Sequence, residues 1–351
     1  MMTDWKTYAY KALLYGLHST RIYKAATRVH AGMGGILTFH RVVEARGAFS
    51  PNAALEVTPA FYDTIIAHLK AGGWRIVTMS DLCHGLRRGS PTDHLVALSF
   101  DDGYRDNFEN AFAICKRHDV PMTVNVTTGF INGTNFPWWY AVEELLRHRD
   151  KVIFTRSGNL VTLPAKTLPQ KMAAYRLLTA AFSHARAHDT TQLLDGLESL
   201  NSVDLRSYCR SLLMSWDMVK TLAESGLVEI GAHTVTHPVL RLLEADHAEA
   251  ELGASRDVLA AVLGRPIEHV AFPYGSRQAV GRRELDLAAK LGFTSAVTTR
   301  HGTLQPEHRN HLAALPRLTV NGHYQSLKTI DVFLSGTSTA LANGFHRVVT
   351  Q

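Results

Sequence analysis

The chain has little cysteine, and its three cysteines lie far apart. Cys83, Cys115 and Cys209 are odd in number, and none of them belongs to a C-x-x-C pair. This pattern excludes a disulfide framework and a zinc ribbon, and it fits a reducing compartment.

Long apolar runs are also absent. No stretch of about 18 apolar residues occurs, which argues against a transmembrane helix. The N-terminus starts with the residues Met1 to Lys6. It lacks the basic region, the apolar region and the small-residue cleavage site that together make a secretion signal. We therefore expect a soluble, cytoplasmic protein.

No run of five or more lysines and arginines occurs in the chain. The net charge is +6, from 37 Lys and Arg against 31 Asp and Glu, and the basic residues are scattered without a long run. We therefore expect no nucleic-acid partner. With 351 residues, of which 46% are hydrophobic, the chain can form one large α/β domain or two ordinary ones.

Short apolar runs alternate with helical patterns along the chain. The helical patterns are at 61–69 after a Thr-Pro start, 108–117 after Asp106, 244–263 before Gly264 and 284–291 before Gly292. The alternation predicts an α/β fold, an irregular (β/α) barrel with its chemistry at the carboxyl ends of the strands. The expected strands are at 35–39, 75–78, 95–100, 122–126, 227–232, 270–272 and 295–298.

The stretch from about 136 to 217 breaks this rhythm. It holds an aromatic cluster, a candidate hairpin around Ser157-Gly158-Asn159 and two helical patterns at 170–187 and 191–200. We interpret it as a helical subdomain inserted into the barrel. The predicted division is an N-terminal helical segment at 1–33, the barrel at 34–330 and a C-terminal tail at 331–351.

Acids and histidines follow two of the expected strands. Asp101 and Asp102 end the run at 95–100, and His233 and His237 come directly after the run at 227–232. Two carboxylates at the end of a buried strand need a partner for their charge. Two imidazoles and a carboxylate with an open position suit a catalytic metal, and the two histidines would be one turn apart in a helical segment.

Three motifs resemble those of polysaccharide deacetylases, the NodB-homology domain of carbohydrate esterase family 4. They are SFDDG at 99–103, HTVTHP at 233–238 and AFPYG at 271–275, in the family's order. The resemblance covers roughly residues 35–320. It implies an irregular (β/α) barrel and metal-dependent removal of N-acetyl groups from glycans that contain N-acetylglucosamine.

The resemblance also implies a role for each matched residue. Asp102, His233 and His237 would hold a divalent metal, for which zinc is the first expectation and cobalt, nickel or iron are alternatives. Asp101 would be the base that takes a proton from the attacking water. The backbone N–H of Tyr274 would help to stabilise the oxyanion.

The sequence departs from the common family pattern at two positions. Ala271 stands where the family has an arginine that holds the catalytic aspartate, and no clear Leu-x-His follows residue 320. His40, at the end of the first expected strand, resembles the general acid of poly-N-acetylglucosamine deacetylases, whose motif order is rotated. We expect His40 to be the acid and Arg317 to hold Asp101; the alternatives are a structural histidine and an arginine on the outer wall.

Aromatic residues near the expected site are candidates for substrate contact. Tyr274 and Pro273 belong to the third motif, while Trp138, Trp139 and Trp216 could stack on sugar rings. The alternative is that the tryptophans form the core of the insertion.

The first 28 residues interleave aromatic and aliphatic side chains with lysines and arginines. They form either a helix that packs on the barrel or on a second subunit of a homodimer, or a peripheral membrane helix. The leading functional hypothesis is a cytoplasmic N-deacetylase of an assembling glycan, such as an exopolysaccharide of a biofilm, with lipid linkage as an option. The alternatives are a deacylase of a small non-glycan amide and an inactive glycan-binding module.

Overall fold

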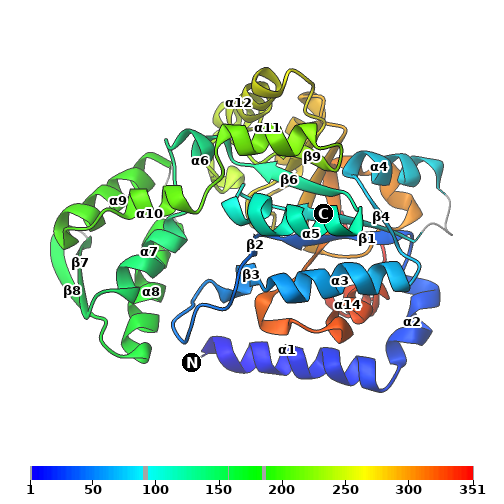
Figure 1. The fold of residues 1–351 in the computed structure, drawn as a ribbon, viewed down its shortest axis with the longest axis horizontal. Coiled ribbons are helices and arrows are strands. Elements are labelled where there is room, and N and C mark those ends of the chain that lie inside the picture. The colour runs from blue at the N-terminus through cyan, green and yellow to red at the C-terminus, as the bar shows by residue number, and fades with distance from the viewer. Residues whose placement is uncertain (1, 90–93, 157, 184–186, 351) are drawn as a thin grey trace.

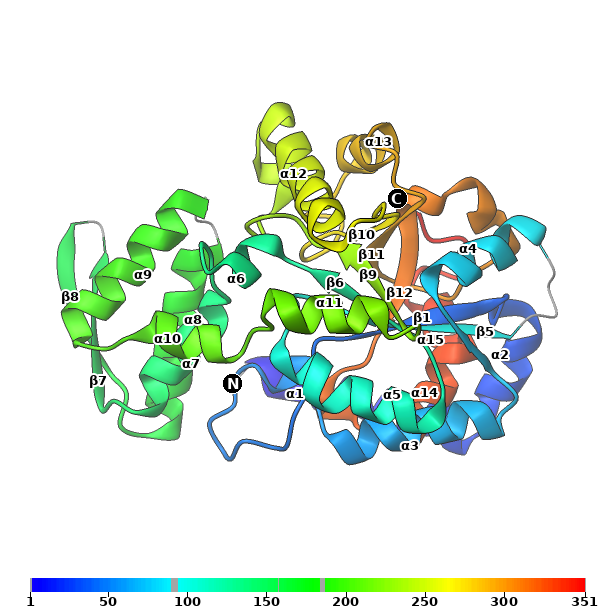
Figure 2. The same ribbon diagram turned by 45° about the horizontal axis from the view of Figure 1, so that its top comes forward.

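A computed structural model describes residues 2–89, 94–156, 158–183 and 187–350 of the chain. Figures 1 and 2 show a barrel ringed by helices, with a separate lobe formed by residues 138–211 at one end.

Seven parallel strands close into the barrel. They are β1 (Gly34–Phe39), β5 (Leu95–Phe100), β6 (Met122–Val126), β9 (Val228–Ala232), β10 (His269–Ala271), β11 (Ser295–His301) and β12 (Leu315–Thr319). Hydrogen-bonded neighbours follow in the order β1, β12, β11, β10, β9, β6, β5, and β5 pairs again with β1. The α/β barrel predicted from the sequence is confirmed.

One strand of the ring, β12, is not among the predicted strands. Pro316 and Arg317 interrupt its apolar run. Proline cannot donate a hydrogen bond to a sheet and arginine is rarely buried, so the segment does not resemble a buried strand in the sequence. The predicted run at 75–78 does form a strand, β4 (Arg75–Val77), but it lies outside the ring and pairs with the first half of β5. A short parallel pair, β2 (Arg41–Val42) with β3 (Glu56–Val57), follows β1.

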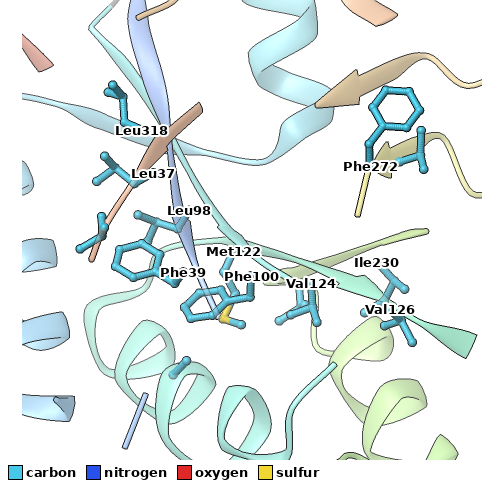
Figure 3. Close-up of a cluster of buried hydrophobic side chains, with 14 of the residues drawn as sticks. Leu37, Phe39, Leu98, Phe100, Met122, Val124, Val126, Ile230, Phe272 and Leu318 are labelled. Carbon is cyan, nitrogen blue, oxygen red and sulfur yellow. The ribbon is translucent and has the colours of Figure 1, made fainter. Parts of the chain in front are cut away.

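Side chains of the strands alternate between two environments. On β5, Leu98 and Phe100 pack with residues of β1, β6 and β9 beneath the surrounding helices, as Figure 3 shows. Leu95 and Ala97 join a second cluster, which draws on β1, β10, β11 and β12 and also on residues 77–86. With a period of two, Ser99 and Asp101 also point inward, closer to the carboxyl end.

The helices around the barrel have the predicted caps in several places. Thr58 Oγ accepts the N–H of Phe61 at the start of α3 (Pro59–Ala71). Gly264, with φ of 65°, ends α12 (Ala245–Leu263). The other barrel helices are α4 (Met79–Arg88), α5 (Ala113–His118), α6 (Thr128–Asn132), α11 (Trp216–Glu224) and α13 (Arg282–Lys290).

Helical turns form over the predicted range 108–117, but the side chain of Asp106 makes no cap hydrogen bond at their start. The segment begins as a π-helical turn, Asn107–Phe112, and continues as α5. The Asp106 carboxylate instead accepts the Arg41 Nε–H at 2.8 Å and the Val42 N–H at 2.7 Å. A buried guanidinium without a carboxylate partner costs more free energy than a helix end without a side-chain cap, so Asp106 pairs with Arg41.

The lobe at 138–211 has a hydrophobic core of its own. It consists of α7 (Trp138–Arg147), a hairpin of β7 (Lys151–Arg156) and β8 (Asn159–Pro164), α8 (Leu168–Ser183), α9 (Ala187–Asn201) and α10 (Leu205–Ser211). Of the predicted turn, Ser157 lies outside the described residues, as do residues 184–186 of the predicted helix at 170–187. The core includes Leu145, Val152, Leu178 and Leu194.

Helices from both ends of the chain pack together beside the barrel. α1 (Met2–Ser19) lies against α14 (Leu327–Leu334), and α2 (Ile22–His30) lies against α15 (Thr337–Ala342). The segment predicted as a tail, 331–351, thus contains the end of α14 and all of α15, and Val332, Phe333 and Val349 in it are buried. Among the described residues, no helix is both long and apolar enough to span a membrane.

Candidate metal and catalytic site

A buried ion pair links β5 to β12 inside the barrel. Arg317 donates from Nη1 to Asp101 Oδ1 at 2.9 Å and from Nη2 to Asp101 Oδ2 at 2.7 Å, while its Nε–H bonds the Thr298 carbonyl at 2.9 Å. Arg317 has no solvent-exposed surface. Burial alone would raise the pKa of Asp101, but the charge of Arg317 outweighs it and holds that pKa below its usual range.

Asn125 on β6 is the third partner of this pair. Its Nδ2 donates to Asp101 Oδ1 at 2.8 Å and lies within hydrogen-bond distance of Ser99 Oγ. The Asp101 carboxylate therefore accepts three hydrogen bonds from two side chains on different strands. Such a carboxylate is ionised and fixed in orientation.

Asp102, His233 and His237 converge on one point next to Asp101. Both histidine Nε2 atoms lie 3.3 Å from Asp102 Oδ1, and the three candidate ligand atoms lie within 4.8 Å of one another. Asp102 Oδ1 is buried and has no hydrogen-bond partner among the described residues. Burial would raise the pKa of Asp102, but the two imidazoles hold it well below its usual range.

These three residues fit a divalent metal. Ligands placed about 2.0–2.1 Å from a tetrahedral zinc lie roughly 3.3 Å apart, which matches the observed spacing. His233 Nδ1 bonds the Ala271 carbonyl at 2.7 Å, so its N–H is on Nδ1 and its Nε2 lone pair faces Asp102. The unpartnered Oδ1 of Asp102 supplies the carboxylate ligand of the set.

The segment between the two histidines is not the helical turn considered from the sequence. It is a bent loop in which Thr234 and His237 have φ of 64° and 57°, and a 3-10 turn, Leu240–Leu242, follows it. The loop brings both Nε2 atoms to Asp102 through its own bends.

Two neighbouring elements hold this histidine loop. Glu251 on α12 accepts the N–H groups of Val235 and Thr236, each at 2.8 Å, and the Thr236 hydroxyl at 2.7 Å. At the start of α6, the N–H of Gly129 donates to the Val235 carbonyl at 2.8 Å. A Cβ on Gly129 would lie 2.4 Å from that carbonyl oxygen, so only glycine fits there.

Strained backbone gathers at this site. Eight described residues other than glycine have positive φ, and four of them are Asp102, Thr234, His237 and Tyr274. Such conformations persist only where surrounding contacts enforce them, and they are common at functional sites.

His40 lies at the same mouth, just after β1. Its carbonyl accepts the Asn107 Nδ2–H at 2.7 Å. Burial lowers the pKa of the His40 imidazole, opposed by the nearby charges of Asp102 and Asp101. The imidazole is therefore within electrostatic range of both carboxylates, as a proton donor to the same reaction centre must be.

The expected substrate-contact residues occupy different positions. Tyr274 is 39% exposed, and its ring contacts the His237 ring. Burial together with the charge of Asp102 raises the pKa of Tyr274 to about 12. Trp139 is buried beside His237 and donates to the Tyr104 hydroxyl at 3.0 Å. Trp138 stacks on Phe182 of the lobe.

Two other expected residues complete this set. Pro273 lies in a tight turn, where its carbonyl accepts the Gly275 N–H. Trp216 starts α11 and donates to Asn132 Oδ1 at 2.9 Å. Trp138, Trp139 and Tyr274 line a small hollow with His237 between the lobe and the barrel.

The family comparison matches residues 88–296 to the polysaccharide deacetylase model, which is more than half of the chain. The chain belongs to the polysaccharide deacetylase family. It is accordingly a hydrolase of the carbohydrate deacetylase type. A comparison with curated protein sequences found no match.

Several solved structures resemble this polysaccharide deacetylase chain over most of their own length. The Streptococcus pyogenes deacetylase PplD in complex with acetate is 20% identical with a TM-score of 0.54, covering 82% of this chain and 92% of that one. IcaB from Ammonifex degensii is 17% identical with a TM-score of 0.56, covering 87% and 97%. A de-N-acetylase from Aggregatibacter actinomycetemcomitans is 16% identical with a TM-score of 0.55, covering 86% and 99%. At these identities the likeness shows the fold.

Sequence reasoning did not find two residues of this deacetylase site. Asn125 is the fourth residue of the otherwise largely apolar strand β6, and a buried amide needs a partner, so this signal was present in the sequence. Glu251 carries no such signal, because it is one of several acids on α12 and meets the histidine loop only in the folded chain.

Proposed function

We propose that this polysaccharide deacetylase is a metal-dependent N-deacetylase of glycans that contain N-acetylglucosamine, acting in the assembly of an exopolysaccharide. The observation that carries the proposal is the convergence of Asp102, His233 and His237 beside an arginine-held Asp101. The exopolysaccharide substrate is supported by the resemblance to poly-N-acetylglucosamine deacetylases at His40.

A divalent metal held by Asp102, His233 and His237 supplies Lewis acidity, which polarises an amide carbonyl and makes a water molecule more acidic. The chain itself supplies the base. The Asp101 carboxylate is ionised and oriented by Arg317 and Asn125, so it can take a proton from the attacking water.

The acetamide C–N bond breaks only if the leaving amine receives a proton. We assign this step to the His40 imidazolium, which lies within electrostatic range of Asp101 and Asp102. The products are acetate and a free sugar amine, and the proton that Asp101 took from water returns to solvent or to His40. We assign the backbone N–H of Tyr274 as a donor to the oxyanion; the contact of the Tyr274 ring with the His237 ring keeps this residue next to the candidate metal ligands.

The test is acetate release from purified N-acetylglucosamine oligomers of increasing length, with simple N-acetyl amides as the comparison substrates. We expect release from the oligomers by the wild type and at least a roughly 100-fold loss of turnover in Asp101→Asn, because a positioned base contributes about 10²–10⁴-fold. Release from small amides alone would contradict the glycan substrate, and no release from either class would contradict the hydrolase.

A further inference from the structure

The outer face of α1 is apolar although its inner face is already packed. Inward, Leu14 is fully buried and Tyr10 contacts the ring of Tyr324. Outward, Trp5 and Tyr8 are 61% and 70% exposed. The remaining exposed positions of this helix between residues 7 and 19 are small or apolar: Ala9, Ala12, Leu13, Gly16 and Ser19.

α2 continues the surface with two parallel stripes. It has no buried residue, and Ile22, Ala25 and Val29 form an exposed small and apolar stripe at helical spacing. Exposed basic residues lie directly beside it: Arg21, which precedes the helix, and Lys24 and Arg28. An apolar stripe flanked by Lys and Arg is typical of a helix that lies in a membrane interface.

The exposed apolar residues are concentrated in this part of the molecule. Of the eleven large hydrophobic residues that are exposed in the described chain, five lie on α1 and α2. They are Trp5, Tyr8, Leu13, Ile22 and Val29. A concentration of this kind marks an interaction surface rather than scattered surface residues.

The net positive charge of residues 2–30 favours an anionic partner. Residues 2–30 contain five Lys or Arg and one Asp, a net charge of +4 out of +6 for the whole chain. A second copy docked on the same face would bring two such segments together, and their repulsion opposes a symmetric dimer. An anionic lipid surface attracts the basic stripe and accepts the aromatic side chains at its headgroup level.

α1 also lies near the mouth of the active site. Tyr10 packs on Tyr324, which follows the carboxyl end of β12. Figures 1 and 2 place the start of α1 toward the end of the barrel that carries the lobe. A surface bound through α1 would therefore lie alongside the barrel and extend toward that end.

We propose that α1 and α2 form a docking surface for an anionic lipid bilayer. It inserts Trp5, Tyr8 and Leu13 at the interface and pairs Lys24 and Arg28 with lipid headgroups. The inference goes beyond the proposed function and does not depend on it, because soluble oligomers can reach the site without the bilayer.

The test is flotation of the purified protein with vesicles of phosphatidylcholine, alone or mixed with phosphatidylglycerol. We expect binding to the anionic vesicles at least roughly tenfold above that to neutral ones, weakened by added salt. Trp5→Ser with Tyr8→Ser should reduce that binding by about tenfold or more through lost apolar burial. Lys24→Glu with Arg28→Glu should remove the preference for anionic vesicles.

Matched controls change the same residue types elsewhere on the surface. Leu160→Ser with Leu242→Ser removes exposed apolar side chains, and Lys166→Glu with Lys220→Glu makes the same change of net charge. Both control pairs should bind as the wild type does, and every variant should keep its melting temperature.

Three outcomes would overturn the proposal. They are no binding to either vesicle, equal loss in the control pairs, and a concentration-dependent dimer that is lost in Trp5→Ser with Tyr8→Ser. The last outcome would assign the surface to a second copy of the chain. Acetate release from soluble oligomers should be the same in all these variants, so a failure here is distinct from a failure of the proposed function.

Discussion

At the scale of single residues, the account depends on the buried pair of Arg317 and Asp101. The family's usual arginine is replaced by Ala271, and the guanidinium comes instead from β12, with two hydrogen bonds to the carboxylate. Removing one partner of a buried ion pair leaves the other charge without compensation, at a cost of about 3–5 kcal/mol.

Arg317→Met should lower turnover on N-acetylglucosamine oligomers by roughly 100-fold or more, because Asp101 loses the donors that keep it ionised and oriented. The double variant with Asp101→Asn should recover stability without recovering activity, since both charges are gone. Steady-state kinetics and urea unfolding measure the two effects. As a control, Arg300→Met removes a buried arginine of β11 that bonds only backbone carbonyls, and it should retain turnover per folded molecule. Wild-type turnover in Arg317→Met would contradict the assigned role.

At the scale of elements, the site depends on a loop that is held in a strained shape from outside. Thr234 and His237 have left-handed backbone, and α12 holds the loop through the Glu251 carboxylate. Partners of this kind, which orient metal ligands without touching the metal, typically change metal affinity by about 10–100-fold when removed.

Glu251→Ala should therefore weaken zinc binding by about 10–100-fold while the barrel remains folded. Competition with a chelating dye measures the affinity, and far-ultraviolet circular dichroism checks the fold. Glu249→Ala is the control, because Glu249 lies on the same helix but pairs with Lys290 at the surface. If both variants bind zinc as the wild type does, Glu251 does not hold the loop in the way described.

Sequence patterns predicted the barrel elements where one periodicity dominates the segment. Six of the seven barrel strands coincide with predicted apolar runs. The seventh, β12, could not be predicted because Pro316 and Arg317 interrupt its apolar run. β12 forms because it pairs with β11 and β1. This pairing is a tertiary interaction, which local strand propensity does not predict.

The site shows the same division. Asp101, Asp102, His233 and His237 could be predicted because acids and histidines at the ends of apolar strands need a partner. The shape of the histidine loop could not, because it depends on Glu251 and Gly129, which come from distant parts of the sequence. Which predicted aromatic residues meet the substrate also depends on packing between the lobe and the barrel.

At the scale of the whole molecule, the outer helices tie the two ends of the chain to the barrel. His301 ends β11, and its Nε2 lies 2.8 Å from Ser338 Oγ on α15 while its ring contacts Phe333 on α14. Burial lowers the pKa of His301 to about 4. A histidine in an unfolded chain takes up a proton near pH 6.5.

Between about pH 6.5 and pH 4, the unfolded chain therefore binds more protons at this residue than the folded chain does. The free energy of unfolding should fall as the pH falls through that window, with about 1–2 kcal/mol from His301 between pH 7 and pH 5. His301→Gln should show a smaller fall than the wild type in urea unfolding at the two pH values. His84→Gln, an exposed histidine of α4, should behave as the wild type does. An equal fall in His301→Gln would show that its protonation is not coupled to folding.

The central claim is that the site of Asp102, His233 and His237 performs the hydrolysis only with a metal. The most direct measurement is acetate release from an N-acetylglucosamine oligomer by protein stripped with a chelator and then titrated with zinc. The account predicts negligible release from the stripped protein, recovery that saturates near one zinc per chain, and no recovery in Asp102→Ala with His233→Ala. Full activity in the stripped protein, or equal recovery in the double variant, would contradict it.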